Sequence, residues 1–148
     1  MIDKTKYLSI DYGLRRVGIA VSDEDKKYSF SRDFLYNDNS LYINLLLLIK
    51  QENISRIILG YPLNFKSEKT SQTIEVEKFK QKLESILQEN SLTISITLFD
   101  ERLTSNLAKQ NIISSGLKKK KRQNKGLVDS TAAQIILQDY LDSLANKN

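Results

Sequence analysis

The order in which strand-like and helix-like patterns follow one another constrains the fold of this 148-residue chain more than any other feature. Three segments with alternating apolar and polar residues come first, and helical and strand patterns then take turns along the rest of the chain. The predicted strands lie at residues 5–11, 16–22, 27–35, 56–59 and 93–99. The predicted helices lie at residues 41–51, 73–89, 104–115 and 127–144.

The connections between these segments decide how the strands pair. Residues 12–15 are too few for a crossover, so the first two strands form an antiparallel hairpin, and the third strand continues it. Helices separate the later strands, which favours parallel pairing within the same sheet. We therefore predict an α/β fold in which a mixed five-stranded sheet, with its first three strands antiparallel, carries helices on both faces. The length suits a single domain over residues 1–148.

The chain contains no cysteine and no histidine. This composition excludes disulfides, thiolate metal sites, and nucleophilic catalysis by a serine–histidine or cysteine–histidine pair. The N-terminus lacks the basic and apolar stretches of a secretion signal, and no segment reaches the ~18 apolar residues that a membrane helix needs. We therefore expect a cytoplasmic protein without a membrane partner, whose chemistry depends on oxygen ligands.

Acidic residues stand where predicted strands end or a helix begins: Asp11, the pair Asp100 and Glu101, and Asp129. Strand ends in an open α/β sheet are where ligands bind, and carboxylates there can hold Mg²⁺ or Mn²⁺ against a phosphate. Two carboxylates ~4 Å apart repel by ~4 kcal/mol at an effective dielectric constant near 20. If these carboxylates converge, a divalent cation is the natural reason.

Each of these acidic residues also has a simpler interpretation. Asp11 precedes a turn that Gly13 permits, so it could be a turn residue that bonds its own backbone. Asp129 lies in the first turn of a predicted helix, where the helix dipole favours a carboxylate in any case. Asp100 and Glu101 are neighbours that point to opposite sides of a strand, so only one of them is expected to bind a metal directly.

Positive charge is concentrated in one segment, residues 118–125. Its six cationic side chains exceed the net charge of +5, so the rest of the chain is slightly acidic. The segment precedes Asp129 directly, which favours a phosphate-binding loop over a merely solvated one. The candidate nucleic-acid-binding residues are Lys118, Lys119, Lys120, Lys121, Arg122 and Lys125, together with Arg15, Arg16 and Asn64 near the acidic positions. Asn64 could equally belong to a simple turn. Among the tyrosines, Tyr12 and Tyr61 are expected near the site.

Five short motifs resemble those of the YqgF family, whose members are described as Holliday-junction resolvases and pre-16S ribosomal RNA nucleases. They span nearly the whole chain, at residues 10–13, 16–20, 60–64, 100–104 and 125–133. The resemblance implies a ribonuclease H-like fold, with Asp11, Asp129 and one residue of the Asp100–Glu101 pair, Glu101 being favoured, as the metal-binding carboxylates. One departure follows Asn64, where the family often has a glycine-containing loop and this chain does not.

The resemblance further implies a metal-dependent nuclease that uses two Mg²⁺ or Mn²⁺ ions. The favoured substrate is precursor 16S ribosomal RNA at its 5′ end, and the partner is then structured RNA. The alternative enzyme is a resolvase of four-way DNA junctions, which makes two symmetric cuts and so needs a dimer. No segment indicates a dimer face, so we expect a monomer or a weak homodimer. A third hypothesis is a non-catalytic RNA-binding assembly factor whose carboxylates are structural.

Overall fold

The computed structural model describes residues 3–101 and 125–146. Its strands are β1 (Lys6–Asp11), β2 (Arg16–Ser22), β3 (Ser29–Tyr36), β4 (Ile54–Tyr61) and β5 (Ser95–Asp100). Its helices are α1 (Leu41–Gln51), α2 (Ser71–Glu89) and α5 (Lys125–Ala145). The predicted helix at 104–115 lies outside the described residues.

The five strands form one mixed sheet in the order β3-β2-β1-β4-β5. The hairpin partners β1 and β2, and then β2 and β3, run antiparallel. Strand β4 is parallel to both β1 and β5. Helices α1 and α2 each return the chain to the end of the sheet at which β1 begins, so the strand that follows runs in the same direction. The predicted architecture is therefore confirmed, including the antiparallel first three strands.

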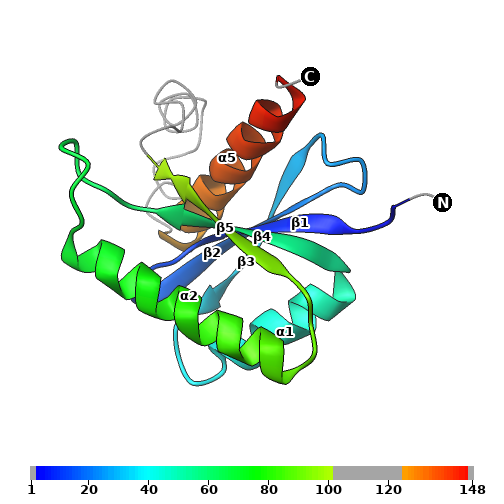
Figure 1. Ribbon diagram of the computed structural model, residues 1–148, viewed down its shortest axis with the longest axis horizontal. Coiled ribbons are helices and arrows are strands. Elements are labelled where there is room, and N and C mark those ends of the chain that lie inside the picture. The colour runs from blue at the N-terminus through cyan, green and yellow to red at the C-terminus, as the bar shows by residue number, and fades with distance from the viewer. Residues whose placement is uncertain (1–2, 102–124, 147–148) are drawn as a thin grey trace.

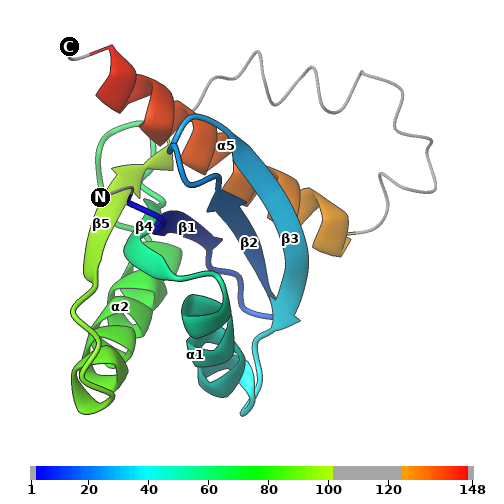
Figure 2. The same ribbon diagram turned by 90° about the vertical axis from the view of Figure 1, so that its right-hand side faces the viewer.

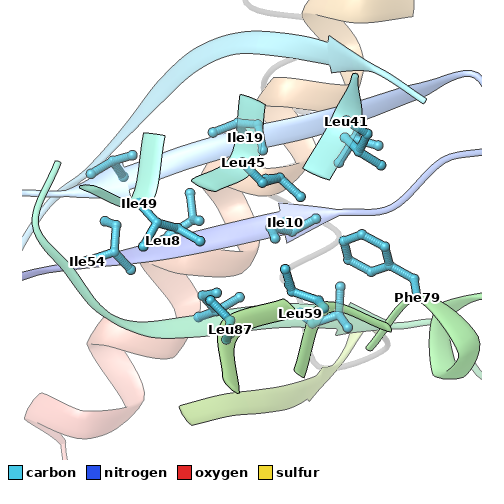
Figure 3. Close-up of a cluster of buried hydrophobic side chains, with 14 of the residues drawn as sticks. Leu8, Ile10, Ile19, Leu41, Leu45, Ile49, Ile54, Leu59, Phe79 and Leu87 are labelled. Carbon is cyan, nitrogen blue, oxygen red and sulfur yellow. The ribbon is translucent and has the colours of Figure 1, made fainter. Parts of the chain in front are cut away.

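Helices cover both faces of this sheet. Helices α1 and α2 lie against one face and α5 crosses the other (Figure 2). The larger apolar cluster fills the α1–α2 side, where Leu8, Ile10 and Leu59 meet Leu45 and Phe79 (Figure 3). A smaller cluster lies under α5 and includes Ala20, Ile58, Ala133, Ile136 and Leu137. Within the described ranges, no helix is both long enough and apolar enough to cross a membrane.

Alternation along the strands explains this division. In β1, Leu8 and Ile10 belong to the α1–α2 cluster, whereas the hydroxyl of Ser9 donates to the backbone oxygen of Ala133 in α5, 2.6 Å away. In β4, Leu59 faces the first cluster and Ile58 faces the second. Side chains of successive residues in a strand point to opposite faces of the sheet, so the face of each strand residue follows from its position relative to these.

Several element boundaries differ from the predicted ones by one or two residues, and two of these differences have a clear cause. Strand β4 runs to Tyr61, beyond Gly60, because its parallel pairing with β5 continues to the Tyr61–Asp100 pair before Pro62. Helix α2 begins at Ser71, not at residue 73, because Thr70 and Thr73 form a reciprocal capping box. The Thr73 hydroxyl also donates to the backbone oxygen of Pro62, which ties the start of α2 to the end of β4.

Candidate functional site

The carboxyl ends of β1, β4 and β5 meet at one edge of the sheet, because these three strands are parallel. Asp11 is the last residue of β1, and Glu101 directly follows β5. Ser9 faces α5, so alternation places Asp11, two residues further on, on the α5 face as well. Gly18 of β2 is its cross-strand partner.

Glu101 reaches across the neighbouring strand. Phe99 packs against the cluster under α5, so Glu101, two positions later, lies on the same face. A methyl group built on Gly60 of β4 would come within 2.5 Å of the Glu101 carboxylate oxygen Oε1 and 3.3 Å of its Cδ. The Glu101 carboxylate therefore lies over the backbone of β4, in the space that a side chain at position 60 would fill.

This placement shortens the separation between the two acidic groups. Strands β1 and β5 are two positions apart in the sheet, with β4 between them, which corresponds to ~9.6 Å at a spacing of ~4.8 Å per strand. Because the Glu101 carboxylate lies over β4, about half of that distance is already spanned. Asp11 and Glu101 thus occupy one face of one sheet edge and approach each other across Gly60.

The direction of α5 bears on the third carboxylate. The ring of Tyr7, early in β1, contacts the ring of Tyr140 with centroids 6.3 Å apart, and Ser9 contacts Ala133. Helix α5 is therefore antiparallel to β1. Its first turns consequently lie towards the end of β1, where Asp11 is found. Position 129 is one helical turn before Ala133 and on the same side of the helix. The side chain of Asp129 lies outside the described part of the molecule.

Asp100 is the last residue of β5, and alternation directs it to the face opposite Glu101. Tyr12 and Tyr61 share that opposite face. The Tyr12 ring stacks on Phe79 with centroids 4.4 Å apart, and the Tyr61 hydroxyl donates to Glu77, both of which belong to α2. Both tyrosines therefore lie on the face opposite the predicted metal-binding carboxylates, and their part in the site stays a prediction.

Arg15 lies in the turn between β1 and β2, and Arg16 is the first residue of β2. They line an open groove of about 710 Å³, whose other wall is the start of α2 with Ser71, Gln72 and Glu75. Arg15 is exposed and Arg16 is half-buried. Arginine side chains in such a groove can contact a phosphate group, and the role of these arginines stays a prediction.

Asn64 shapes the loop between β4 and α2. Its side-chain oxygen accepts hydrogen bonds from the backbone amides of Lys66 and Glu68, both at 2.9 Å. Ser67 adopts a φ of 64°, the left-handed conformation that a glycine would adopt most easily. The loop therefore makes a tight turn without glycine, and Asn64 has the turn role that was its alternative interpretation. Its contact with nucleic acid stays a prediction.

Most of the predicted basic surface lies outside the described residues. Lys118, Lys119, Lys120, Lys121 and Arg122 precede α5, and Lys125 is described only as the first residue of that helix. In the described ranges, no group of three acidic side chains is placed to hold a metal ion, but the predicted third ligand, Asp129, is not among the side chains compared.

The described residues nevertheless fit a divalent cation. The available donors are carboxylate oxygens, which Mg²⁺ and Mn²⁺ prefer. The space above Gly60 holds the Glu101 carboxylate where a side chain would exclude it.

Sequence reasoning missed the role of Gly60. The glycine was interpreted as the end of a strand, although it continues the strand and lies beneath a predicted metal ligand. Its φ does not lie in the left-handed range, so backbone freedom does not account for it. The sequence did contain a signal for this. Pro62, two residues later, is sufficient to end the strand, so the glycine was not needed for that purpose.

The fold defines the class of protein. RuvC from Thermus thermophilus, solved in complex with a Holliday junction substrate, superposes with a TM-score of 0.58 at 11% identity and covers 96% of each chain. The yeast mitochondrial Holliday junction resolvase Ydc2 gives a TM-score of 0.59 at 12% identity, covering 98% of this chain and 81% of its own. The chain thus has the ribonuclease H-like fold of these resolvases (Figure 1).

The sequence defines the family within that class. The model of the family described as RuvX, Holliday junction resolvase, matches residues 5–143, and the chain belongs to this family. A protein of Flavobacterium psychrophilum named "Putative pre-16S rRNA nuclease" is 38% identical over 136 residues, which cover 92% of this chain and 96% of the relative. A protein of the same name from a Sulfurihydrogenibium strain is 35% identical over 144 residues, covering 97% and 94%.

Proposed function

We propose that this protein is a metal-dependent nuclease that hydrolyses phosphodiester bonds in structured nucleic acid, in a single domain over residues 1–148. The observation that carries the proposal is the position of the Glu101 carboxylate above Gly60, on the face and edge where Asp11 ends β1. Asp11 and Glu101 come from the ends of separate strands, in a chain that has no histidine or cysteine for other metal chemistry.

In this proposal Asp11, Glu101 and Asp129 hold Mg²⁺ or Mn²⁺, and Asp100 on the opposite face supports the end of β5. The bound cations would supply an acidified water as the nucleophile and charge stabilisation for the leaving oxygen. The residues of the chain would orient the scissile phosphate, because the carboxylates fix the sheet edge at which the cations and the phosphate bind. No side-chain base is required for this chemistry.

The favoured substrate is the 5′ extension of precursor 16S ribosomal RNA. The relatives of 34–38% identity that support this choice carry the name of a pre-16S rRNA nuclease. A second candidate is a four-way DNA junction, which the description of the family and the titles of the resolvase structures favour. If the substrate is precursor 16S ribosomal RNA, the protein acts in ribosome assembly in the cytoplasm.

The deciding experiment compares cleavage of 5′-extended 16S precursor RNA and of a four-way DNA junction in Mg²⁺, Mn²⁺ or EDTA. Asp11→Asn should lower the cleavage rate by about 10³-fold, because transition-state charge then loses about 4 kcal/mol of stabilisation. The matched control is Asp33→Asn on β3, an exposed carboxylate on the far edge strand, which should cleave like the wild type.

Cleavage of one substrate, lost in Asp11→Asn and retained in the control, chooses between RNA and DNA. Tight binding of RNA without cleavage under any metal would contradict the nuclease and favour a non-catalytic assembly factor. A junction cut symmetrically by a dimer would assign the second candidate.

The segment at 118–125 is the proposed phosphate-binding loop. If about four of its charges contact phosphates on duplex DNA, log K should fall with log salt at a slope near −3.6. Replacing Lys118, Lys119, Lys120 and Lys121 by glutamine should flatten that slope towards zero. The control replaces four lysines of the helices on the other face, namely Lys50, Lys78, Lys80 and Lys82. Equal slopes in both variants would exclude the loop as the binding surface.

A further inference from the structure

Gly60 lies at the centre of the predicted site and contributes no functional group to it. It is the seventh residue of β4, between the strand that ends with Asp11 and the strand that precedes Glu101. Its pairing with Phe99 of β5 belongs to a continuous parallel ladder. Glycine weakens a strand, and neither a bulge nor a left-handed φ accounts for it here.

The surroundings of Gly60 show what the missing side chain permits. A Cβ at this position would lie 2.5 Å from Glu101 Oε1, a distance that real Cβ atoms do not tolerate, and 3.1 Å from the Cδ1 atom of Ile136 in α5. Two groups therefore border the same small space: the carboxylate of Glu101, which follows β5, and a methyl group of Ile136 in α5. Ile136 is 2% exposed and belongs to the packed cluster under α5.

The two neighbours differ in their freedom to yield. Ile136 is held by the buried cluster around it, so a new methyl group would displace it by only a few tenths of an ångström. The Glu101 carboxylate is the end of a flexible side chain on a residue beyond the strand, so it is the neighbour that yields more readily. An added methyl group should therefore move the Glu101 carboxylate and leave the fold in place.

We propose that Gly60 is a positioning residue for the metal site: the absence of a side chain at this position allows the Glu101 carboxylate to lie over β4 and to approach Asp11. The inference rests on the proposed function, because it assigns Glu101 a metal-binding role. Gly60 itself touches neither the metal nor the substrate. It acts through Glu101 alone, so its effect should vanish when the Glu101 side chain is absent.

The test measures Mn²⁺ affinity by titration, together with thermal unfolding in EDTA, on the 148-residue chain. Gly60→Ala should weaken Mn²⁺ binding by about 10–100-fold, the range seen when a group that orients a metal ligand is changed. Its melting temperature should remain within about 4 °C of the wild type. The cleavage rate should fall in parallel, but the affinity is the decisive measurement because it needs no substrate.

Double variants separate positioning from packing. Glu101→Ala should weaken Mn²⁺ binding, and Gly60→Ala added to it should weaken binding no further. Ile136→Val removes the Cδ1 atom, so it relieves crowding against α5 but should not restore the affinity of Gly60→Ala. Multiplicative losses in the first double variant, or recovery in the second, would overturn the inference.

Two further outcomes are decisive. If Glu101→Ala binds Mn²⁺ like the wild type, the metal-site assignment fails together with the inference, whereas normal binding by Gly60→Ala alone overturns only the inference. If Gly60→Ala does not fold, the double variant of Gly60→Ala with Glu101→Asp replaces it, because the shorter side chain removes the contact between the new methyl group and the carboxylate. This double variant should fold and bind Mn²⁺ like Glu101→Asp alone, and either a failure to fold or a further loss of affinity would contradict the proposal.

Discussion

The two faces of the sheet at the carboxyl ends of β1, β4 and β5 are formed by alternate residues of the same motifs, but they differ in how they are packed. On the α2 face, Tyr12 stacks on Phe79 and Tyr61 bonds Glu77, so the side chains fill space and join the helix to the sheet. On the α5 face, Asp11 stands beside a glycine over which Glu101 extends. One face is packed for stability, and the other leaves room for carboxylates.

This comparison shows that a short motif need not have one role. In the motif at residues 10–13, Ile10 belongs to the main apolar cluster, Asp11 faces α5 and Tyr12 packs on α2. The strand period of two separates adjacent residues into a structural set and a candidate catalytic set. Variants on the two faces should therefore change stability and activity independently.

The largest expected change in stability comes from the packed face. Phe79→Ala removes a ring that is 2% exposed and contacts the rings of Tyr12 and Tyr42. The free energy of unfolding should fall by about 3–4 kcal/mol, as is typical of buried aromatic residues replaced by alanine. Urea unfolding measures it. Mn²⁺ affinity of the folded variant should be unchanged, and a large loss of affinity would show that the two faces are coupled.

Asp11→Asn should change stability in the opposite direction. Without metal, neutralising one of several gathered carboxylates removes repulsion, so the variant should unfold in EDTA with a free energy about 1 kcal/mol higher than the wild type. Adding Mg²⁺ should then stabilise the wild type more than the variant, because only the wild type keeps its ligand set. A lower melting temperature in EDTA would instead assign Asp11 a structural role in the turn.

Glu52 offers an effect no larger than that of Asp11, and a contrast at the other end of the strands. It is a half-buried carboxylate between Lys6 at 3.0 Å and Arg32 at 3.3 Å. Burial alone would raise its pKa, but the hydrogen bond from Lys6 and the charge of Arg32 outweigh burial and lower the pKa below its usual value.

A lowered pKa in the folded state stabilises the protein above the unfolded pKa, and this stabilisation is lost as the pH falls through the folded value. Glu52→Gln should therefore reduce the free energy of unfolding by about 1 kcal/mol at pH 7. The difference between variant and wild type should vanish at acidic pH, below the folded pKa. A pH series of urea unfolding curves measures both, and a constant difference at all pH values would contradict the electrostatic cause.

Periodicity predicted most of the fold because the decisive patterns are local. Strand β2 occupies the predicted residues 16–22, and α1 occupies the predicted 41–51. The missed first turn of α2 depends on a Thr70–Thr73 box, whose polar residues carry no apolar period. The extension of β4 depends on pairing with β1 and β5, which a short apolar run does not reveal.

The candidate site was predictable in part for the same reason. Acidic residues at strand ends indicated Asp11 and Glu101, and the alternation of β5 now places Glu101 on the face of Asp11. The face of Tyr12 and Tyr61 could not be fixed without knowing which helix covers which side. The role of Gly60 is a contact between two strands and a helix, so no local pattern encodes it.

The hydrogen bond between Ser9 and Ala133 joins residues 124 positions apart, and this separation affects folding during translation. During synthesis, all five strands leave the ribosome before α5 does, because that helix begins at Lys125. A nascent chain can therefore assemble the α1–α2 cluster early, while the opposite face stays uncovered. If the proposed site needs Asp129, a growing chain cannot cut the RNA around it before this part of α5 has been translated.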